Sequence, residues 1–388
     1  MQSLKGLKVV EFCEIAAGPF CAMLLADMGA DVVKVERPGG DAMRMWPPVN
    51  DGYSENFASI NRNKRSVVLD MKTEDGLRAA KAIILDSDVV VENFRPGVMA
   101  RLGIDYQTLS AEKPSLIYCS ISAFGQSGPR SKEGGFDLTM QAMSGIMSVT
   151  GEPGGAPTKC GVPLCDFVAA LYGAFGVVSA LNERQRTGKG QNLDVSMLGT
   201  SLAIAALQTS EYFGTGRDPR KLGSAHPRNA PYQAFRAQDG YFGMAAGNNS
   251  LWHQVCDVVG LPELKQNDRY RTPTLRAQNQ DALRETLEAV FETRPVAHWL
   301  SAFAAAGVPS SPINDYSDAL SDPQVVHMGW VQDITLPNGK ATKTFGSPLR
   351  INGRSLPVAA SPPALGEHTE EVLGEVDPQG LQTAMMPV

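Results

Sequence analysis

One aspartate stands where the chain changes character. Asp166 ends the Gly- and Pro-punctuated run KCGVPLCD, which starts at Lys159, and the apolar segment FVAAL follows at once. A carboxylate at the start of a helix can cap the free N–H groups of the first turn. It can also be a covalent nucleophile, kept ionised by the positive end of the helix dipole. The residues around Asp166 leave both roles open, and capping is the commoner one.

Alternating strands and helices predict the framework that positions Asp166. The expected strands cover residues 8–12, 31–36, 66–70, 89–92, 116–121 and 191–197, and the expected helices cover 20–28, 74–82 and 167–186. This alternation predicts an α/β fold, with a doubly wound parallel sheet covered by helices on both faces. The helix after Asp166 carries one apolar stripe, formed by Leu171, Phe175, Val178 and Leu181.

The length of 388 residues indicates about two domains. We expect a large domain over residues 1–200, completed by about 335–388, and a smaller α+β domain over 223–318. Linkers are expected at 201–222 and 319–334. In the smaller domain the pattern predicts a strand over 241–245 and helices over 251–259 and 277–291, and the tail carries one more helix near 367–373.

The composition disfavours several kinds of site. The six cysteines show no CxxC spacing and the five histidines show no HxxxH or HExxH spacing, so no metal site is expected. A net charge of −6 and a pI near 5.5 argue against nucleic-acid binding. We see no apolar run of about 20 residues and no signal peptide, so we expect a cytoplasmic protein with no membrane partner.

Basic residues nevertheless gather in one part of this acidic chain. They are Lys34, Arg37, Arg44, Arg62, Lys64, Arg65, Lys72, Arg95 and Arg101. Either they receive a small polyanionic ligand or they form a solvated face. A dinucleotide is disfavoured, because the loop over residues 13–19 offers only Gly18 and then Pro19, which has no N–H. Glu36 stands where a ribose-binding acid would be, but that signal is weak without the glycines.

A set of longer motifs resembles the class III coenzyme A transferases, the CaiB/BaiF family. The motifs are AGP from Ala17, GADVVKVE from Gly29, ENFRPGVMARLG from Glu92 and RTGKGQ from Arg186, and the likeness covers nearly the whole chain. It implies a Rossmann-like large domain, a smaller domain and an interlocked homodimer with active sites at the interface. It also implies that Asp166 is the nucleophile. The substrates would be an acyl-CoA thioester and a small carboxylate, with no permanently bound cofactor.

The same resemblance assigns further site residues. The implied CoA contacts are Ala16, Ala17, Arg37, Met71, Lys72, Asn93, Phe94 and Arg101. Asp137 matches a second acid that orients groups near the nucleophile, and Gly247 and Asn248 match a loop that shields the intermediate from water. Ordinary alternatives stay open: Phe94 as a core residue, Asp137 in a local turn bond, and residues 246–249 as a polar loop. Oxyanion donors, worth roughly 3 kcal/mol each, could come from the backbone of residues 16–18 or 246–249.

Two positions depart from related enzymes. Oxalate-using transferases of this kind carry Gln where this chain has Ala16, so oxalate is not expected as the acceptor. The related racemases carry a base histidine where this chain has Phe136, which cannot take a proton from an α-carbon.

The sequence therefore favours a CoA transferase acting from a short acyl-CoA, such as succinyl-CoA, to a small carboxylic or dicarboxylic acid. A racemase and a non-catalytic CoA binder are the alternatives. Arg44, Arg62 or Arg228 either holds a distal carboxylate or is structural.

Overall fold

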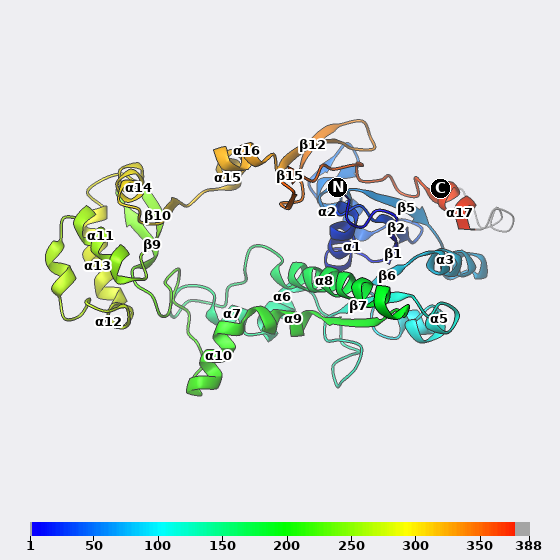
Figure 1. The fold of residues 1–388 in the computed structure, drawn as a ribbon, viewed down its shortest axis with the longest axis horizontal. Helices are drawn as coiled ribbons and strands as arrows, with labels where there is room; N and C mark the ends of the chain where they lie inside the picture. The colour runs from blue at the N-terminus through cyan, green and yellow to red at the C-terminus, as the bar shows by residue number, and fades with distance from the viewer. Residues whose placement is uncertain (1, 377–388) are drawn as a thin grey trace. The chain divides into compact units, whose positions relative to one another are not determined.

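A computed structural model describes residues 2–376 of the chain. In this part a six-stranded parallel sheet runs in the order β5-β2-β1-β6-β7-β8 (Figure 1). Its strands are β1 (Lys8–Phe12), β2 (Asp31–Glu36), β5 (Lys64–Val68), β6 (Val89–Glu92), β7 (Ile117–Ser122) and β8 (Asn192–Ser196). Counted along the chain, this is the doubly wound order 3-2-1-4-5-6 of Rossmann folds. The predicted α/β fold with a parallel sheet is confirmed.

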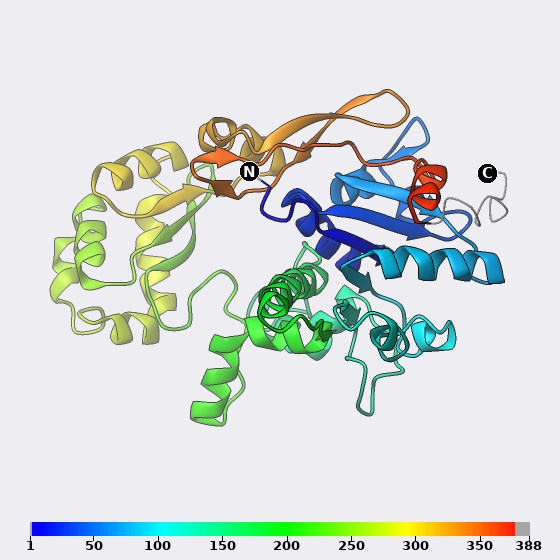
Figure 2. The same cartoon turned by 45° about the vertical axis from the view of Figure 1, so that its right-hand side comes forward.

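Helices cover both faces of this sheet (Figure 2). On one face lie α1 (Ala17–Asp27) and α8 (Leu164–Thr187). On the other face lie α3 (Glu74–Asp86), α5 (Tyr106–Glu112) and α17 (Thr369–Val376). Because helices of such a fold run antiparallel to the strands they follow, their N-termini lie at the carboxyl edge of the sheet, where ligands bind.

Helices α1 and α8 pack closely through small side chains. A Cβ added to Gly173 of α8 would lie 3.0 Å from the Sγ atom of Cys21 on α1, so an alanine there would require its neighbours to shift by a few tenths of an ångström. The large residues of α8 point the other way: Leu171, Phe175 and Val178 are exposed, Phe175 by 71%. The apolar stripe found in the sequence is therefore not the face that packs on the sheet.

The length and composition of α8 correct one expectation. Within its 24 residues, a window of 18 residues reaches a mean hydropathy of 1.8, enough by length and composition alone to span a bilayer, whereas no such segment was expected. One face of α8 is nevertheless buried against α1 and β7, as in the core helix of a globular domain.

The end of the described chain covers an edge of the sheet. The backbone N–H of His368 donates to the carbonyl oxygen of Ser66 (2.9 Å), and the N–H of Val68 donates to Oγ1 of Thr369 (3.1 Å). Strand β5 would otherwise present a row of unpaired backbone groups. Segment 363–369 thus completes the large unit, although it is remote in sequence.

The chain divides into two compact units, which we describe separately. Among the described residues, the first comprises 2–146, 159–216 and 323–376, and the second comprises 147–158 and 217–322. The second unit includes residues 147–158, a segment that the sequence interpretation assigned to the large domain. The stretch 201–222, expected as a linker, contains the end of α9 (Met197–Ile204) and all of α10 (Ala206–Thr215).

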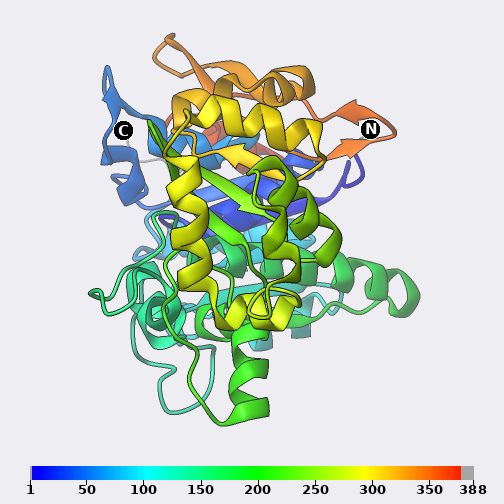
Figure 3. The ribbon, with the colours of Figure 1, turned by 90° about the vertical axis from the view of Figure 1, so that its left-hand side faces the viewer.

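The second unit (Figure 3) is built on a small antiparallel sheet in the order β11-β10-β9. Its elements include β9 (Tyr232–Ala237), β10 (Gly240–Ala245), β11 (Ser310–Pro312), α11 (Asn249–Val258), α12 (Pro273–Gln278), α13 (Gln280–Phe291), α14 (Val296–Ala305) and α15 (Tyr316–Ser321). Aromatic rings fill its core, with Phe291 edge-on to Phe242 and to Phe303. The helix expected over 277–291 is divided between α12 and α13.

Shorter elements complete the first unit. They include α2 (Glu55–Asn61), α4 (Val98–Arg101), α6 (Asp137–Met143), α16 (Pro323–Met328), the 3-10 helix η1 (Ala42–Met45), and the strands β3 (Val49–Asn50), β4 (Tyr53–Ser54), β12 (Val331–Thr335), β13 (Ala341–Phe345), β14 (Arg350–Ile351) and β15 (Arg354–Ser355). The one-turn helix α7 (Ile146–Val149) lies at the boundary between the units.

Candidate active site

The strand order reverses between β1 and β6, and the loops after these strands meet there. The Oδ1 atom of Asn93 accepts from the Glu14 N–H (3.0 Å), and its Nδ2 donates to the Glu14 carbonyl oxygen (2.9 Å). Ligands of doubly wound sheets bind in the crevice at such a switch point. Two predicted CoA contacts, Asn93 and Ala16, belong to these loops.

The N-terminus of α1 offers free hydrogen-bond donors. Its N-cap residue is Ala16, which has no side chain able to cap. Within residues 2–376, the backbone N–H groups of Ala16, Ala17 and Gly18 have no partner. A Cβ added to Gly18 would lie 2.4 Å from the Sγ of Cys13, so the turn is too close for any larger residue. These N–H groups point to an anion site.

Asp166 is not the cap of α8, which corrects the first reading of this residue. The helix begins two residues earlier, at Leu164, with Pro163 at the N-cap position, so Asp166 lies inside the first turn. Its carboxylate makes no hydrogen bond or ion pair with any residue in the described part of the chain. A half-buried carboxylate without partners is available for another role.

The capping group of α8 comes from another helix. Asp137, the first residue of α6, accepts the Cys165 N–H with Oδ1 (2.8 Å) and the Gln141 Nε2–H with Oδ2 (2.7 Å). The Oε1 atom of Gln141 in turn accepts the Cys160 N–H (2.8 Å). The side chain of Asp137 is thus bound to the backbone next to Asp166, which is more than a local turn bond.

The environment of Asp166 favours its protonated form. Burial first, and the negative charge of Asp137 second, raise the pKa of Asp166 to about 7. The expectation that the helix N-terminus keeps this carboxylate ionised is therefore not met, because desolvation and a like charge dominate. Near pH 7 the carboxylate and the acid are both populated. Perturbation of this kind is common at functional sites.

The first turns of α1 and α8 lie side by side. The ring of Phe20 on α1 and that of Phe167 on α8 have centroids 4.6 Å apart. Both rings pack on a small apolar cluster that includes Ala16 and Met43. The turn that carries the free N–H groups therefore adjoins the turn that carries Asp166.

Most of the clustered basic residues form ion pairs within the protein. Lys34 and Lys64 are buried, and both pair with Glu11. Burial would lower the pKa of Lys34, but the carboxylates around it raise it above its usual value. Neither of the two expectations, a polyanion site or a solvated face, describes these lysines.

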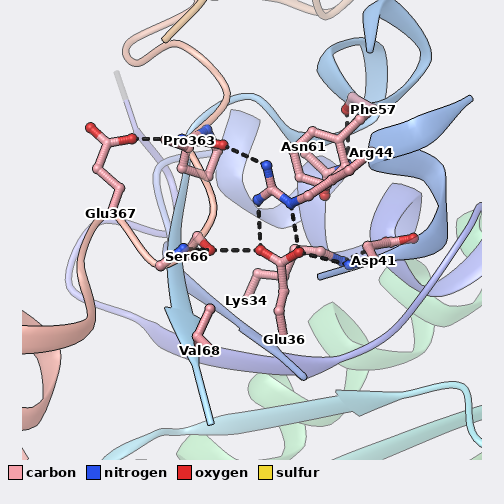
Figure 4. Close-up of polar contacts among 12 residues, drawn as sticks. Lys34, Glu36, Asp41, Arg44, Phe57, Asn61, Ser66, Val68, Pro363 and Glu367 are labelled. Carbon is pink, nitrogen blue, oxygen red and sulfur yellow. Dashed lines mark hydrogen bonds and ion pairs between the residues drawn. The ribbon is translucent and has the colours of Figure 1, made fainter. Parts of the chain in front are cut away.

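Two of the arginines that could hold a distal carboxylate are also engaged. Arg44 forms a bidentate pair with Glu36 (2.7 and 2.6 Å) and stacks over the Phe57 ring (Figure 4). Arg62 forms a bidentate pair with Asp27. Because Glu36 accepts from Arg44, it does not serve as a ribose-binding acid.

The remaining predicted CoA contacts lie at or near the carboxyl edge. Lys72 and Arg101 are exposed and pair with no carboxylate in the described part of the chain. Arg37 is exposed and pairs with Glu14 (3.0 Å). Met71 and Phe94 are half-buried and pack against the core under α3, so the core reading of Phe94 has support. All of these roles stay predictions.

Gly247 and Asn248 belong to the second unit. Asn248 is the N-cap of α11, and its Oδ1 accepts the Leu251 N–H (2.9 Å). A Cβ added to Gly247 would lie 3.0 Å from the Asn229 Cβ, so the chain passes close to that residue. These contacts agree with a loop that leads into a helix, and the proposed shielding role stays a prediction.

Three residues that the sequence interpretation did not single out belong to the surroundings of the site. They are Asp41, Glu92 and Gln141. Burial raises the pKa of Glu92 to about 7, and its carboxylate accepts the Phe94 N–H (2.9 Å). Gln141 stands four residues after Asp137, a spacing that places two helical side chains together and could have been noticed.

Known proteins support this architecture as that of a CoA-transferase. The profile of CoA-transferase family III matches residues 4–369. A succinyl-CoA:glutarate CoA-transferase of Mus musculus is 38% identical, covering 97% of this chain and 87% of its own length. An acetyl-CoA:oxalate CoA-transferase of Acetobacter aceti is 39% identical over 90% of this chain and 89% of its own.

A solved structure agrees with these sequence relatives. A CaiB/BaiF family protein from Brucella suis superimposes with a TM-score of 0.86 at 38% identity, covering 96% of this chain and 99% of its own. The predicted family is confirmed. The chain belongs to CoA-transferase family III and is an enzyme of that class.

Proposed function

We propose that this enzyme transfers CoA from succinyl-CoA to a small dicarboxylic acid, with Asp166 as the covalent nucleophile. The observation that carries the proposal is the state of the Asp166 carboxylate. It is half-buried beside a helix N-terminus with free N–H groups, and within residues 2–376 nothing binds it. Closure around a substrate would further strip water from it and raise its reactivity.

The reaction begins with attack of the Asp166 carboxylate on the thioester carbonyl carbon. A C–O bond forms, the C–S bond breaks, and CoA leaves as a thiolate from an aspartyl–acyl anhydride. The thiolate then attacks the aspartyl carbonyl, which releases the first acid and leaves an aspartyl–CoA thioester. The acceptor carboxylate attacks this thioester, and the returning thiolate takes the acyl group of the new anhydride. The Asp166 carboxylate is restored, and no redox step is involved.

The free N–H groups of Ala16, Ala17 and Gly18 suit the oxyanions that form in these steps. Preorganised backbone donors are worth about 3 kcal/mol each at such a position. The contact between Phe20 and Phe167 supports this assignment, since it holds the first turns of α1 and α8 together. Lys72, Arg101 and Arg37 are suited to the phosphates of CoA because they are basic and exposed.

A dicarboxylic acceptor has support from the relatives, because glutarate and oxalate, which appear in their names, are both dicarboxylates. Alanine at position 16 remains an argument against oxalate for this chain. Arg44 and Arg62 are engaged in ion pairs inside the first unit, so neither is proposed as the partner of the distal carboxylate.

We also propose a cytoplasmic homodimer. The support is the exposed apolar face of α8, formed by Leu171, Phe175 and Val178, which a second copy would cover. An interlocked arrangement is the form that the family resemblance implies.

The test is the Asp166→Ala variant, assayed for CoA transfer from succinyl-CoA to glutarate. Turnover is expected to vanish while CoA binds with an affinity within about threefold of the wild type. Asp88→Asn is the matched control, because Asp88 is also half-buried but lies before β6, at the amino edge of the sheet. Asp88→Asn should retain turnover. Transfer by Asp166→Ala would contradict the mechanism, and deuterium exchange at the α-carbon of an acyl-CoA would indicate a racemase instead.

A further inference from the structure

The turn between β1 and α1 is held in a conformation that its own sequence disfavours. Ile15 has φ of 69°, in the left-handed region. A β-branched residue rarely adopts that region, because its Cβ crowds the backbone, and the conformation persists only where neighbouring groups hold it. Ile15 immediately precedes the free N–H groups of residues 16–18.

Two buried, oppositely charged side chains hold this turn. Both carboxylate oxygens of Asp41 accept the Ile15 N–H, at 3.1 and 3.3 Å. Asp41 forms an ion pair with the Lys34 ammonium at 3.0 Å, and Lys34 donates to the Cys13 carbonyl oxygen at 2.8 Å. Both side chains are completely buried. Asp41 and Lys34 therefore bind the backbone on either side of Glu14.

Lys64 and Asn93 form further hydrogen bonds to the backbone of this turn. Lys64 donates to the Pro19 carbonyl oxygen at 2.8 Å and to Glu11 at 2.9 Å. Asn93 holds Glu14 through two hydrogen bonds. The backbone is thus bound at residues 13, 14, 15 and 19, while residues 16–18 keep their N–H groups free.

An outer layer of the network fixes Asp41 itself. Glu36 accepts the Asp41 N–H at 3.0 Å (Figure 4). Glu36 also accepts from Arg44 and from the Ser66 hydroxyl, so its carboxylate has a single orientation. Asp41 reaches the turn from this fixed position.

Such a network is a costly way to fill a core. Buried ion pairs contribute little net stability, and apolar residues of similar size are often as stable. Here the Glu11 Oε2 atom is buried and has no hydrogen-bond partner among residues 2–376, which adds to the cost. The charges do, however, determine the geometry of the turn, which apolar contacts would not.

We propose that Asp41 and Lys34 are positioning residues, which hold the β1–α1 turn so that the N–H groups of Ala16–Gly18 face the reacting carbonyl. The inference rests on the proposed function, because it assumes that these N–H groups bind the oxyanion. It assigns to a buried ion pair a role in the rate of the acyl-transfer step and none in CoA affinity.

The experiment measures the single-turnover rate of Asp166 acylation by succinyl-CoA in the Asp41→Asn variant. An asparagine NH₂ would replace either Oδ1, which accepts the Ile15 and Met43 N–H groups, or Oδ2, which accepts from the Lys34 ammonium, so at least one contact is lost in each orientation. The acylation rate is expected to fall about 30- to 100-fold, the scale of a misplaced or lost oxyanion donor. The dissociation constant of CoA, measured by calorimetry, should change less than about threefold.

The matched control is Asp27→Asn. Asp27 is also buried, pairs with Arg62 and accepts from Asn63, but it lies at the other end of α1. This variant should lose thermal stability to a similar extent, with an acylation rate within about twofold of the wild type. Equal slowing in both variants would mean that only stability matters, and would overturn the proposal.

A second variant decides the question if Asp41→Asn does not fold. Lys34→Met/Asp41→Leu removes both charges together, which buried pairs often tolerate. It should fold and acylate slowly, and a folded double variant with the wild-type rate would overturn the proposal. Failure of the proposed function looks different, because the wild-type enzyme would then form no Asp166 adduct at all.

Discussion

The first turns of α1 and α8 adjoin, but they differ in whether a side chain accepts hydrogen bonds from their backbone N–H groups. Neither helix is capped by its own N-cap residue, Ala16 in α1 and Pro163 in α8. In α8 a carboxylate from outside the helix, that of Asp137, accepts the Cys165 N–H. In α1 the groups over residues 16–18 stay without partners among the described residues.

This difference assigns the two helix ends different tasks. At the start of α8 the Asp137 carboxylate accepts the Cys165 N–H, and that hydrogen bond holds the chain next to Asp166 in place. The end of α1 keeps its donors for a ligand, and a buried ion pair holds its turn instead. If one end supplies the nucleophile and the other its oxyanion donors, changes at the two ends should affect the reaction differently.

The largest effect is expected from Gly18→Ala, which perturbs the α1 end. The new Cβ would lie 2.4 Å from the Cys13 Sγ and 2.7 Å from the Cys13 Cβ, so the turn must move. Loss of the aligned donors should lower kcat about 10²- to 10³-fold. Cys13→Gly/Gly18→Ala, which makes room for the added methyl group, should recover part of that loss. A Gly18→Ala enzyme with unchanged kcat would separate this turn from catalysis.

The next effect is expected from Asp137→Asn, which perturbs the α8 end. An amide can keep the hydrogen bond to Cys165 but removes the negative charge near Asp166. Because that charge helps to raise the pKa of Asp166, the midpoint of the acylation rate against pH should move to lower pH. We expect kcat to fall about tenfold through weaker positioning. A midpoint that does not move would show that Asp137 acts only through hydrogen bonds.

A smaller effect should appear in the pH dependence of the wild-type enzyme. Since the attacking form is the carboxylate and the pKa of Asp166 is about 7, single-turnover acylation should increase severalfold between pH 6 and pH 8 and then level off. A profile flat from pH 5 upward would mean that Asp166 is ionised throughout, in contrast to its buried setting.

The smallest effect is on stability. At low pH a carboxyl whose pKa is raised on folding is protonated in both the folded and the unfolded state, so it does not change the stability. Above its unfolded pKa it lowers the free energy of unfolding, and this loss is complete once the pH exceeds its folded pKa. Asp166→Asn should therefore raise Tm by a few degrees at pH 8, and by much less at pH 4. The two calorimetric scans need no substrate. Equal shifts at the two pH values would argue against the raised pKa.

Local patterns predicted much of the large unit. The strands expected over 8–12, 31–36 and 89–92 agree with β1, β2 and β6. Strand β5 was expected at 66–70 but begins at Lys64, because two basic residues at its start do not look like a buried strand. Lys64 is buried because Glu11 of the adjoining strand β1 pairs with it, and no local pattern contains that contact.

The site was predictable in its residues but less so in its contacts. The resemblance pointed to Asp166 and Asp137, whereas the link from Asp137 to Cys165 depends on how α6 packs beside α8. The apolar stripe on α8 was assigned no partner, and the small residues of the opposite face pack on α1 instead. Asp41 was missed, and Lys34 was assigned only to a polyanion site or a solvated face, because charged residues are almost always at the surface unless they are paired.

The measurement that tests the central claim most directly is the trapping of the covalent intermediate. The protein is incubated with succinyl-CoA, quenched with hydroxylamine and digested, and the modified residue is located by peptide mass spectrometry. The account predicts a hydroxamate on Asp166. An unmodified Asp166 in a protein that demonstrably binds CoA and transfers it would contradict the account.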